Sequence, residues 1–449
     1  MGATSLSAEQ QASEITGNNL ANVNNPTYSR EQLVMQSALP VDTPIGQEGT
    51  GVDASSIQQF RDAYVDSQVV SQTSVTSSYT AQQSTLQNAE IYLDEQLQAG
   101  SATDSTTNSP NGLSANISNL FNQFSGLTTS NTQAAAGTTI ADAQNLAKQF
   151  NQVSASLSNI QGNTNQSVQT GVAAANQDLA TIAGLNQQIA VATASGGTAD
   201  ALVDQRQTTL QNLASYVNFS SSTESNGSVD VSIGGVSMVA GVTTPDQLQT
   251  FTNSSGNLMV QAQNAGTPLT ITGGSIGGNI TARDGALATL QSGLDAVASN
   301  LITQVNTVYN ASTGENFFTG ADASDIAVNS SVGASDLNTA VSNDGSLASN
   351  LANLATTPIS SLKNQTLQAS YDSTVSGLGD SIDIATGQLN SNQTVAQMLS
   401  NQQSSVSGVN TDEEMTNLIE FQKAYEASAE LISTVSNMLE TVIDMAYES

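Results

Sequence analysis

The sequence contains neither cysteine nor histidine, and these absences exclude several kinds of site. Without them the chain has no disulfide, no thiolate or imidazole metal site, and no Ser-His-Asp or Cys-His catalytic unit. Lysine and arginine together number 7 against 38 aspartates and glutamates, which makes the net charge −31. Seven scattered cations cannot form a basic stripe along a phosphate backbone. This composition argues against binding to nucleic acids or to anionic membranes.

Other residue types are scarce as well. Tryptophan is absent, aromatic residues make up 4% of the chain and charged residues only 10%. No apolar run approaches the ~18 residues of a membrane span, and we expect no classical secretion signal at the N-terminus. The 449 residues correspond to about three domains at roughly 150 residues each.

Apolar residues recur at steps of three and four over most of the chain, which predicts amphipathic helices. The clearest segments are 113–127, 140–160, 168–189, 202–217, 287–308 and 375–399. We interpret the two segments between 140 and 189 as long antiparallel helices. Glycines interrupt residues 310–362, so we expect loops there with short helical pieces, and the sequence assigns them no function.

The hydrophobic period changes to two between about 216 and 282. Val229, Val231 and Ile233 alternate with polar residues, and segments 258–262 and 269–272 show the same alternation. Turns rich in glycine, asparagine and serine separate these segments. Helical spacing resumes afterwards, so the pattern predicts a small antiparallel β domain inserted into a helical one.

The C-terminal segment carries a strict heptad pattern that predicts a coiled-coil seam. Its apolar positions are Leu418, Phe421, Tyr425, Ile432, Val435, Leu439 and Val442. A single helix cannot bury such a stripe, so it needs a partner helix from the same chain or from another chain. The simpler alternative is a core helix of the same domain.

Three other features have a chemical and a structural interpretation. Residues 273–277 match G-x-S-x-G and residues 360–363 match S-x-x-K, but without a histidine or the accompanying motifs we attribute both matches to chance. All four arginines stand beside acidic residues, which favours structural salt bridges over subunit contacts. A pair of carboxylates could still serve a glycan hydrolase, although sugar clefts commonly contain aromatic platforms.

The N-terminal segment 16–30 reads TGNNLANVNNPTYSR. It resembles the S-N-N-I-A-N…T-P-G-Y-S-R signature at the start of bacterial flagellar rod, hook and hook-associated proteins, with departures at Gly17, Leu20 and Thr27. Physically, a helix ends at an asparagine-rich turn marked by proline, and Tyr28 and Arg30 can hold the extended segment that follows. The residues that we expect to shape this turn are Asn18, Asn19, Leu20, Asn22, Pro26 and Tyr28.

Three further stretches are similar to the hook-associated members of this family. They are 202–206 (LVDQR), 273–284 with its continuation to Asn316–Phe318, and 407–425. The resemblance implies a structural, non-enzymatic protein without cofactor or metal, exported unfolded by the flagellar type III apparatus to the extracellular hook–filament junction. Its implied partners are further copies of itself, the hook protein, the second junction protein and an export chaperone on the C-terminal helix. A filament (flagellin-like) or cap subunit is the alternative within the same class.

We therefore predict a mainly α fold with an inserted β domain. The two halves of the chain are expected to form an elongated, discontinuous helical bundle with coiled-coil-forming terminal helices that are poorly ordered in the monomer. The expected divisions are an N-terminal axial helix and turn (1–34), the first part of the bundle (35–215), the β domain (216–282), the second part of the bundle (283–404) and the C-terminal coiled-coil helix (405–449). The heptad positions and the turn residues named above form the expected assembly interface.

Overall fold

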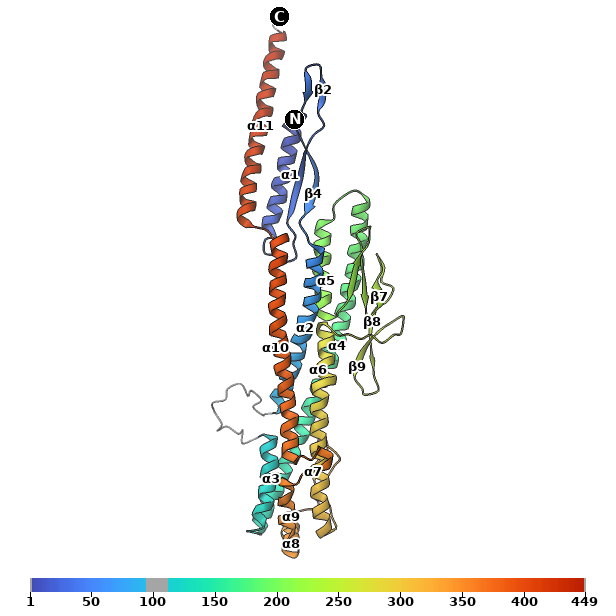
Figure 1. The fold of residues 1–449 in the computed structure, drawn as a ribbon, viewed down its shortest axis with the longest axis vertical. Helices are drawn as coiled ribbons and strands as arrows, with labels where there is room; N and C mark the ends of the chain where they lie inside the picture. Colours follow the sequence, from blue (N-terminus) through green and yellow to red (C-terminus); the bar gives the residue numbers. More distant parts are fainter. Residues whose placement is uncertain (1, 94–111, 448–449) are drawn as a thin grey trace.

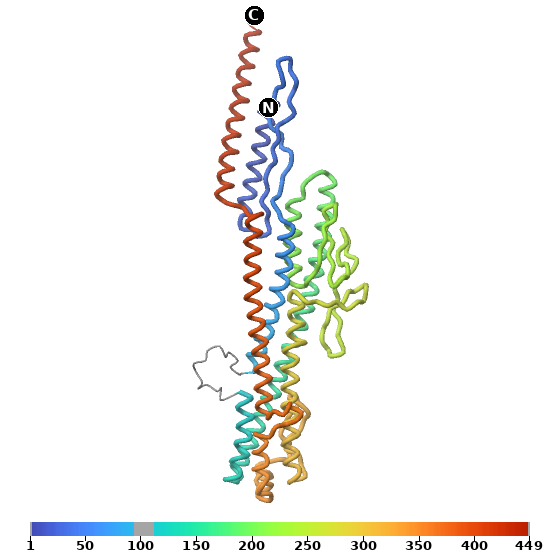
Figure 2. The backbone as a smooth tube through the Cα atoms, viewed as in Figure 1, coloured from blue at the N-terminus to red at the C-terminus, as the bar shows by residue number. Residues whose placement is uncertain are grey.

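The computed structural model describes residues 2–93 and 112–447 of an elongated molecule (Figure 1). Long helices run along its length and form the body; they are α2 (Ala63–Leu93), α4 (Gln133–Ala194), α7 (Ala288–Thr313) and α10 (Leu367–Ser407). Helices from both halves of the chain pack side by side, so the predicted discontinuous bundle is confirmed. Both ends of the described chain lie at the same end of the molecule (Figure 2).

One hydrophobic core lies in the half of the body far from the chain ends. It packs α3 (Leu113–Leu127) and the first half of α4 against α7, α8 (Ala334–Asn343), α9 (Leu347–Asn353) and the start of α10. Phe317 touches Phe124, Tyr309 and Phe318 edge to face, with ring centroids 4.9 to 5.7 Å apart. Residues 310–362 contain the expected short helical pieces, together with a small pair of strands, β10 (Phe318–Thr319) and β11 (Ala327–Val328).

A second core joins the inserted β domain to the bundle. The second half of α4 and α5 (Asp200–Tyr216) pack against an antiparallel sheet of β5 (Ser220–Thr223), β6 (Val229–Ile233) and β7 (Val236–Val239) and a hairpin of β8 (Leu248–Thr252) and β9 (Leu258–Ala262). Val229, Val231 and Ile233 alternate inward on β6, as predicted. Next, α6 (Gly274–Ala282) continues through a π-helical turn, Arg283–Leu287, into α7.

The two ends of the chain form a separate terminal arm. It contains α1 (Gly2–Ala21), α11 (Thr411–Tyr447) and an extended hairpin in which β1 (Glu31–Ser37) pairs with β4 (Val52–Gln59), and β2 (Val41–Thr43) with β3 (Gly46–Glu48). The two helices are antiparallel, because Asn19 contacts Glu414 at one end of α1 and Gly2 lies against Ile432 at the other.

Four sequence-based expectations require correction. Residues 140–189 belong to the single helix α4, because no proline interrupts residues 161–167 and the buried Thr164 continues the helical spacing from Ile160 to Val168. Leu269 and Ile271 are buried, but no strand forms there because the ladder ends at an isolated bridge between Gln261 and Pro268. Residues 35–59 form hairpins rather than bundle helices, and 274–282 are helical rather than part of the β domain.

Helix α2 is absent from the sequence-based prediction. Its large apolar buried residues, Val65, Leu86 and Leu93, stand near its two ends. Between them Ser74, Ser78 and Thr85 are buried, so no apolar period marks the helix. It packs so closely on α6 that a Cβ on Gly278 would lie 2.1 Å from Ser78 O. Only small residues permit this approach. The corrections above concern the elements inside the predicted divisions, and the five domain limits themselves remain predictions.

Candidate functional site: the neck and the terminal arm

The terminal arm joins the body at a neck of buried polar groups, and Asn19 lies at its centre. Its Nδ2 donates to Glu31 O (2.8 Å) and to Glu414 Oε2 (3.0 Å). Its Oδ1 accepts from the Tyr28 hydroxyl (2.7 Å) and from the Glu31 N–H (3.0 Å). Both amide donors and both carbonyl lone pairs are therefore used in a buried position. One side chain thus connects α1, the turn, β1 and α11.

Arg30 fastens the first turn of α11 to the neck. Its Nε donates to Glu414 Oε1 and its Nη2 to Glu413 Oε1, each at 2.7 Å. The guanidinium also lies 5.7 Å from the centroid of the Phe60 ring. Because the Glu414 side chain is only 2% exposed, its charge requires these partners. The Arg30 backbone N–H donates to Ser407 O at the end of α10 (2.9 Å).

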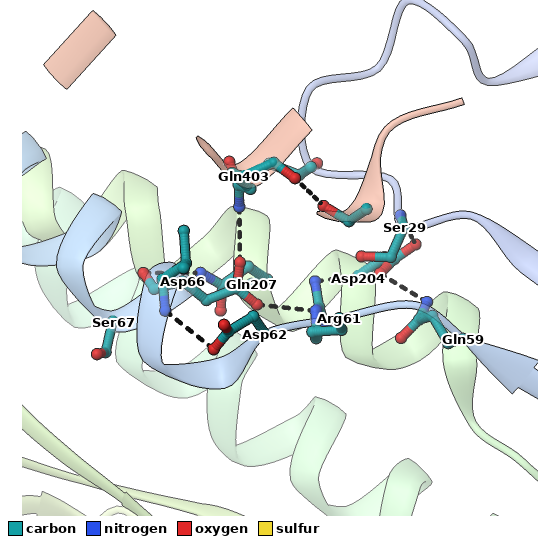
Figure 3. A network of polar contacts seen from close by, with 12 residues as sticks. Ser29, Gln59, Arg61, Asp62, Asp66, Ser67, Asp204, Gln207 and Gln403 are labelled. Carbon is teal, nitrogen blue, oxygen red and sulfur yellow. Dashed lines mark hydrogen bonds and ion pairs between the residues drawn. The ribbon is translucent and has the colours of Figure 1, made fainter. Parts of the chain in front are cut away.

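A second polar network, drawn in Figure 3, lies directly below the neck in the body. Asp204 of α5 accepts from the Ser29 N–H (3.2 Å) and from Gln59 Nε2 (2.9 Å). Arg61 forms ion pairs with Asp204 (3.2 Å) and with Asp66 of α2 (2.8 Å). Asp66 also accepts from Gln403 Nε2 of α10 (2.6 Å). Side chains from distant parts of the chain therefore hold the base of the arm.

This concentration of carboxylates changes their acidity. Burial, followed by the charges of Asp200 and Asp204, raises the pKa of Glu31 to about 7. Burial also raises the pKa of Asp204 to about 6, with Arg61 and the hydrogen bonds from Ser29 and Gln59 acting in the opposite direction. The neck therefore contains carboxylates that titrate near neutral pH.

The predicted turn residues have different positions. Asn19 and Tyr28 meet in the neck, whereas Asn22 donates to Asn18 in a local hydrogen bond of 3.0 Å. Leu20 is half-buried, and Asn18 and Pro26 are exposed. The turn and the extended segment after it are present, as expected from the sequence. The assembly role of these residues stays a prediction.

The side chains of the heptad stripe become more exposed to solvent toward the C-terminal end of α11. Leu418 and Phe421 are half-buried on the part of α11 that lies along α1. Tyr425 and Ile432 are 38% and 39% exposed, and exposure rises to 43% at Val435 and 57% at both Leu439 and Val442. Because α1 begins opposite Ile432, the last part of α11 projects beyond it (Figure 1). Among the described residues, α1 therefore lies along the first half of the stripe, and Val435, Leu439 and Val442 lie beyond it.

The acids next to each arginine in the sequence are mostly not its partners in the structure. Arg283 pairs with its neighbour Asp284 (2.8 Å), but Arg30 and Arg61 bind acids distant in sequence. Arg206 donates to Asn186 Oδ1 (2.9 Å) and Gly227 O (2.6 Å) instead of an acid. Scarcity of arginine was a signal that these side chains are structural. It could not identify Glu413, Glu414, Asp66 or Asp204 as their partners.

Away from the neck, the described chain contains grooves and scattered acidic residues. A groove of about 760 Å³ between α2 and α4 is lined mainly by serine, threonine and asparagine, and no carboxylate contributes to its lining. Within residues 2–93 and 112–447 no three acidic side chains are grouped to hold a metal ion. None of the helices in those ranges is both long and apolar enough to cross a membrane. These observations give no support to the glycan hydrolase alternative.

Two family models and one sequence relative agree with one another. Residues 100–323 match the family described as flagellar hook-associated protein FlgK helical domain, and residues 400–445 match the flagellar basal body rod FlgEFG protein C-terminal family. Flagellar hook-associated protein 1 of Bacillus subtilis (strain 168) is 27% identical over 98% of this chain and 96% of its own. The structure of the flagellar hook junction protein FlgK from Burkholderia pseudomallei matches with a TM-score of 0.49 and 23% sequence identity. The match covers 56% of this chain and 46% of the FlgK chain, which is less than half of its length. Residues 100–323 therefore belong to the FlgK helical-domain family, and the chain as a whole is similar in sequence to flagellar hook-associated protein 1.

Proposed function

We propose that this chain is a structural adaptor that polymerises through its terminal helices and connects the flagellar hook to the filament. The observation that carries the proposal is the end of α11 beyond α1, where Val435, Leu439 and Val442 remain exposed. Burying such side chains stabilises an assembly by roughly 25 cal/mol per Å² of apolar surface. Neighbouring copies supply the missing helical surface, so the protein acts by packing rather than by catalysis.

The same exposed stripe supports the proposed route and partners. The protein is exported and located outside the cell, between the hook protein and the second junction protein. Before export the stripe needs a cover, because exposed apolar helices associate nonspecifically. An export chaperone on the C-terminal helix provides that cover. The hook, the second junction protein and the chaperone are proposed partners.

The decisive experiment introduces charge into the projecting part of α11. The double variant Leu439→Asp with Val442→Asp should be exported but absent from the junction, because aspartate prevents burial of both positions. Incorporation is measured by immunogold labelling of purified hook–filament structures. The unfolding free energy of the soluble monomer should change by no more than about 0.5 kcal/mol, since both side chains are exposed.

Asn437→Asp is the matched control, because it adds a charge to the same turn at a position outside the heptad stripe. This variant should be incorporated normally. Normal incorporation of the double variant contradicts the proposal. Labelling along the whole filament or at its tip would instead support the filament or cap subunit.

A further inference from the structure

Cations are scarce in this chain, and most of them engage groups of the chain itself. Among the described residues Arg30, Arg61, Arg283 and Lys423 form ion pairs, and Arg206 donates to an asparagine and a backbone carbonyl. Lys148 and Lys363 have no carboxylate within 4.0 Å in that part of the molecule. Among the described side chains, these two lysines are the cations that form no ion pair and no side-chain hydrogen bond within the chain.

The backbone around Lys363 is unusual. Lys363 and Asn364 have φ values of 57° and 60°, the positive region that glycine favours, and they are the two non-glycine residues in this region among those described. The turn is closed by the Gln365 N–H donating to Leu362 O (3.0 Å), and Leu362 is buried beneath it. A strained and anchored turn therefore presents the exposed Lys363 side chain to solvent.

Lys363 also lines a groove of about 600 Å³ between α7 and the start of α10. Its other polar lining is mainly hydroxyl groups, and no aspartate or glutamate contributes to it. Three of these hydroxyls make no side-chain hydrogen bond to a described group, namely Ser292, Ser370 and Ser373. An ammonium group beside unused hydroxyl donors is a suitable donor set for a carboxylate.

We propose that Lys363 and this groove bind a carboxylate of a second copy of the chain. The inference rests on the proposed function, in which copies lie side by side. Each copy carries a charge of −31, so neighbouring copies repel one another unless opposite charges meet at their interface. Lys363 is the unpaired cation that stands in a groove without acids, whereas Lys148 lies on the outer face of α4 and does not line that groove.

Zero-length cross-linking with a carbodiimide tests the contact, because the reagent joins an amine to a carboxylate only when the two are paired. Purified hook–filament structures assembled from mixed light and isotope-labelled copies are cross-linked and analysed by mass spectrometry. The expected product joins Lys363 to an aspartate or glutamate of another copy, and Lys148 remains unlinked. Mixed-isotope peptides identify links between copies.

Other outcomes overturn the inference. If the chain is present at the junction but Lys363 is unlinked, linked within its own copy or linked to a different protein, the docking proposal fails and the proposed function stands. Equal linking of Lys148 also contradicts it. Absence of the chain from the junction contradicts the proposed function itself.

Variants separate an interface role from a structural one. Lys363→Gly removes the charge and suits the left-handed backbone, so the monomer should be at least as stable as the original chain. Retention of this variant in salt-washed junctions should nevertheless fall about threefold, and Lys363→Glu should lower it about tenfold because like charges then meet. Lys148→Gln should be retained normally. Normal retention of Lys363→Gly and Lys363→Glu would overturn the proposal.

Discussion

The body and the terminal arm contain helices of similar pattern with different surroundings. In the body, α4 buries a residue in almost every turn from Ala136 to Ile189, because α3, α5, α7 and the β domain surround it. In the arm, Glu414 is the one buried side chain among the described residues of α11, since α1 covers a single face. The comparison teaches that a heptad pattern specifies a contact surface but does not determine whether the chain itself provides the second surface.

Removing a core aromatic residue should have the largest effect. Phe317→Ala deletes the centre of the Phe124, Tyr309 and Phe318 cluster and should lower the free energy of unfolding by about 3–5 kcal/mol. Urea denaturation of the monomer measures it. Leu439→Ala in the arm is the control, and its effect should stay within about 0.5 kcal/mol. Similar losses for both variants would contradict the difference between the two regions.

The neck is intermediate between the two regions. Asn19→Ala leaves the Tyr28 hydroxyl, the Glu31 backbone and Glu414 without partners and should weaken the neck by about 2 kcal/mol. Hydrogen exchange should therefore become faster in α1 and β1 while α7 stays protected. The exposed neighbour Asn18 provides the control, and Asn18→Ala should leave exchange unchanged. Faster exchange throughout the body would show that the arm and the body unfold together.

Titration of Glu31 should make the stability of the neck depend on pH. Its pKa rises from 4.5 to about 7, so the folded state binds more protons than the unfolded state between these values. Stability should therefore fall as pH rises from about 4.5 to 7. Glu31→Gln should be more stable than the original chain above pH 7 and should flatten the slope. Part of the slope remains because the pKa of Asp204 is raised to about 6.

Thermal unfolding and hydrogen exchange at several pH values measure this dependence. Glu426→Gln, an exposed change on α11, should leave the slope unaltered. A steeper slope after Glu31→Gln would contradict the assignment to Glu31.

The smallest effect is expected at the surface ion pair of the arm. Lys423 lies 2.7 Å from Glu426, with side chains 71% and 65% exposed. Lys423→Gln should therefore change the unfolding free energy by less than about 0.5 kcal/mol, as measured by urea denaturation. A loss as large as that of Asn19→Ala would mean that solvent does not screen this pair.

Sequence reasoning predicted helices with strong apolar periods well, including α3, whose bounds agree with the predicted segment 113–127. It failed for α2, whose buried face contains serine and threonine, and for the hairpins between residues 31 and 59, whose alternation is weak. At the neck, the signature predicted Tyr28 and the turn. Glu414, the partner of Asn19, lies 395 residues away from it in the sequence, and Gln403, the partner of Asp66, lies 337 residues away. No local sequence pattern indicates contacts over such separations.

The class of this molecule follows from its amino-acid pattern alone. Its hydrophobic periods predict long helices and an inserted sheet. The lack of cysteine and histidine excludes disulfides, thiolate or imidazole metal sites and histidine-based catalytic units, and the scarcity of cations argues against binding to nucleic acids. Which helical surfaces meet depends on how distant parts of the chain pack together. Whether α1 covers all of α11 or half of it depends on the relative length and direction of two helices that lie at opposite ends of the chain. Periodicity reports one helix at a time, whereas burial is a property of the pair.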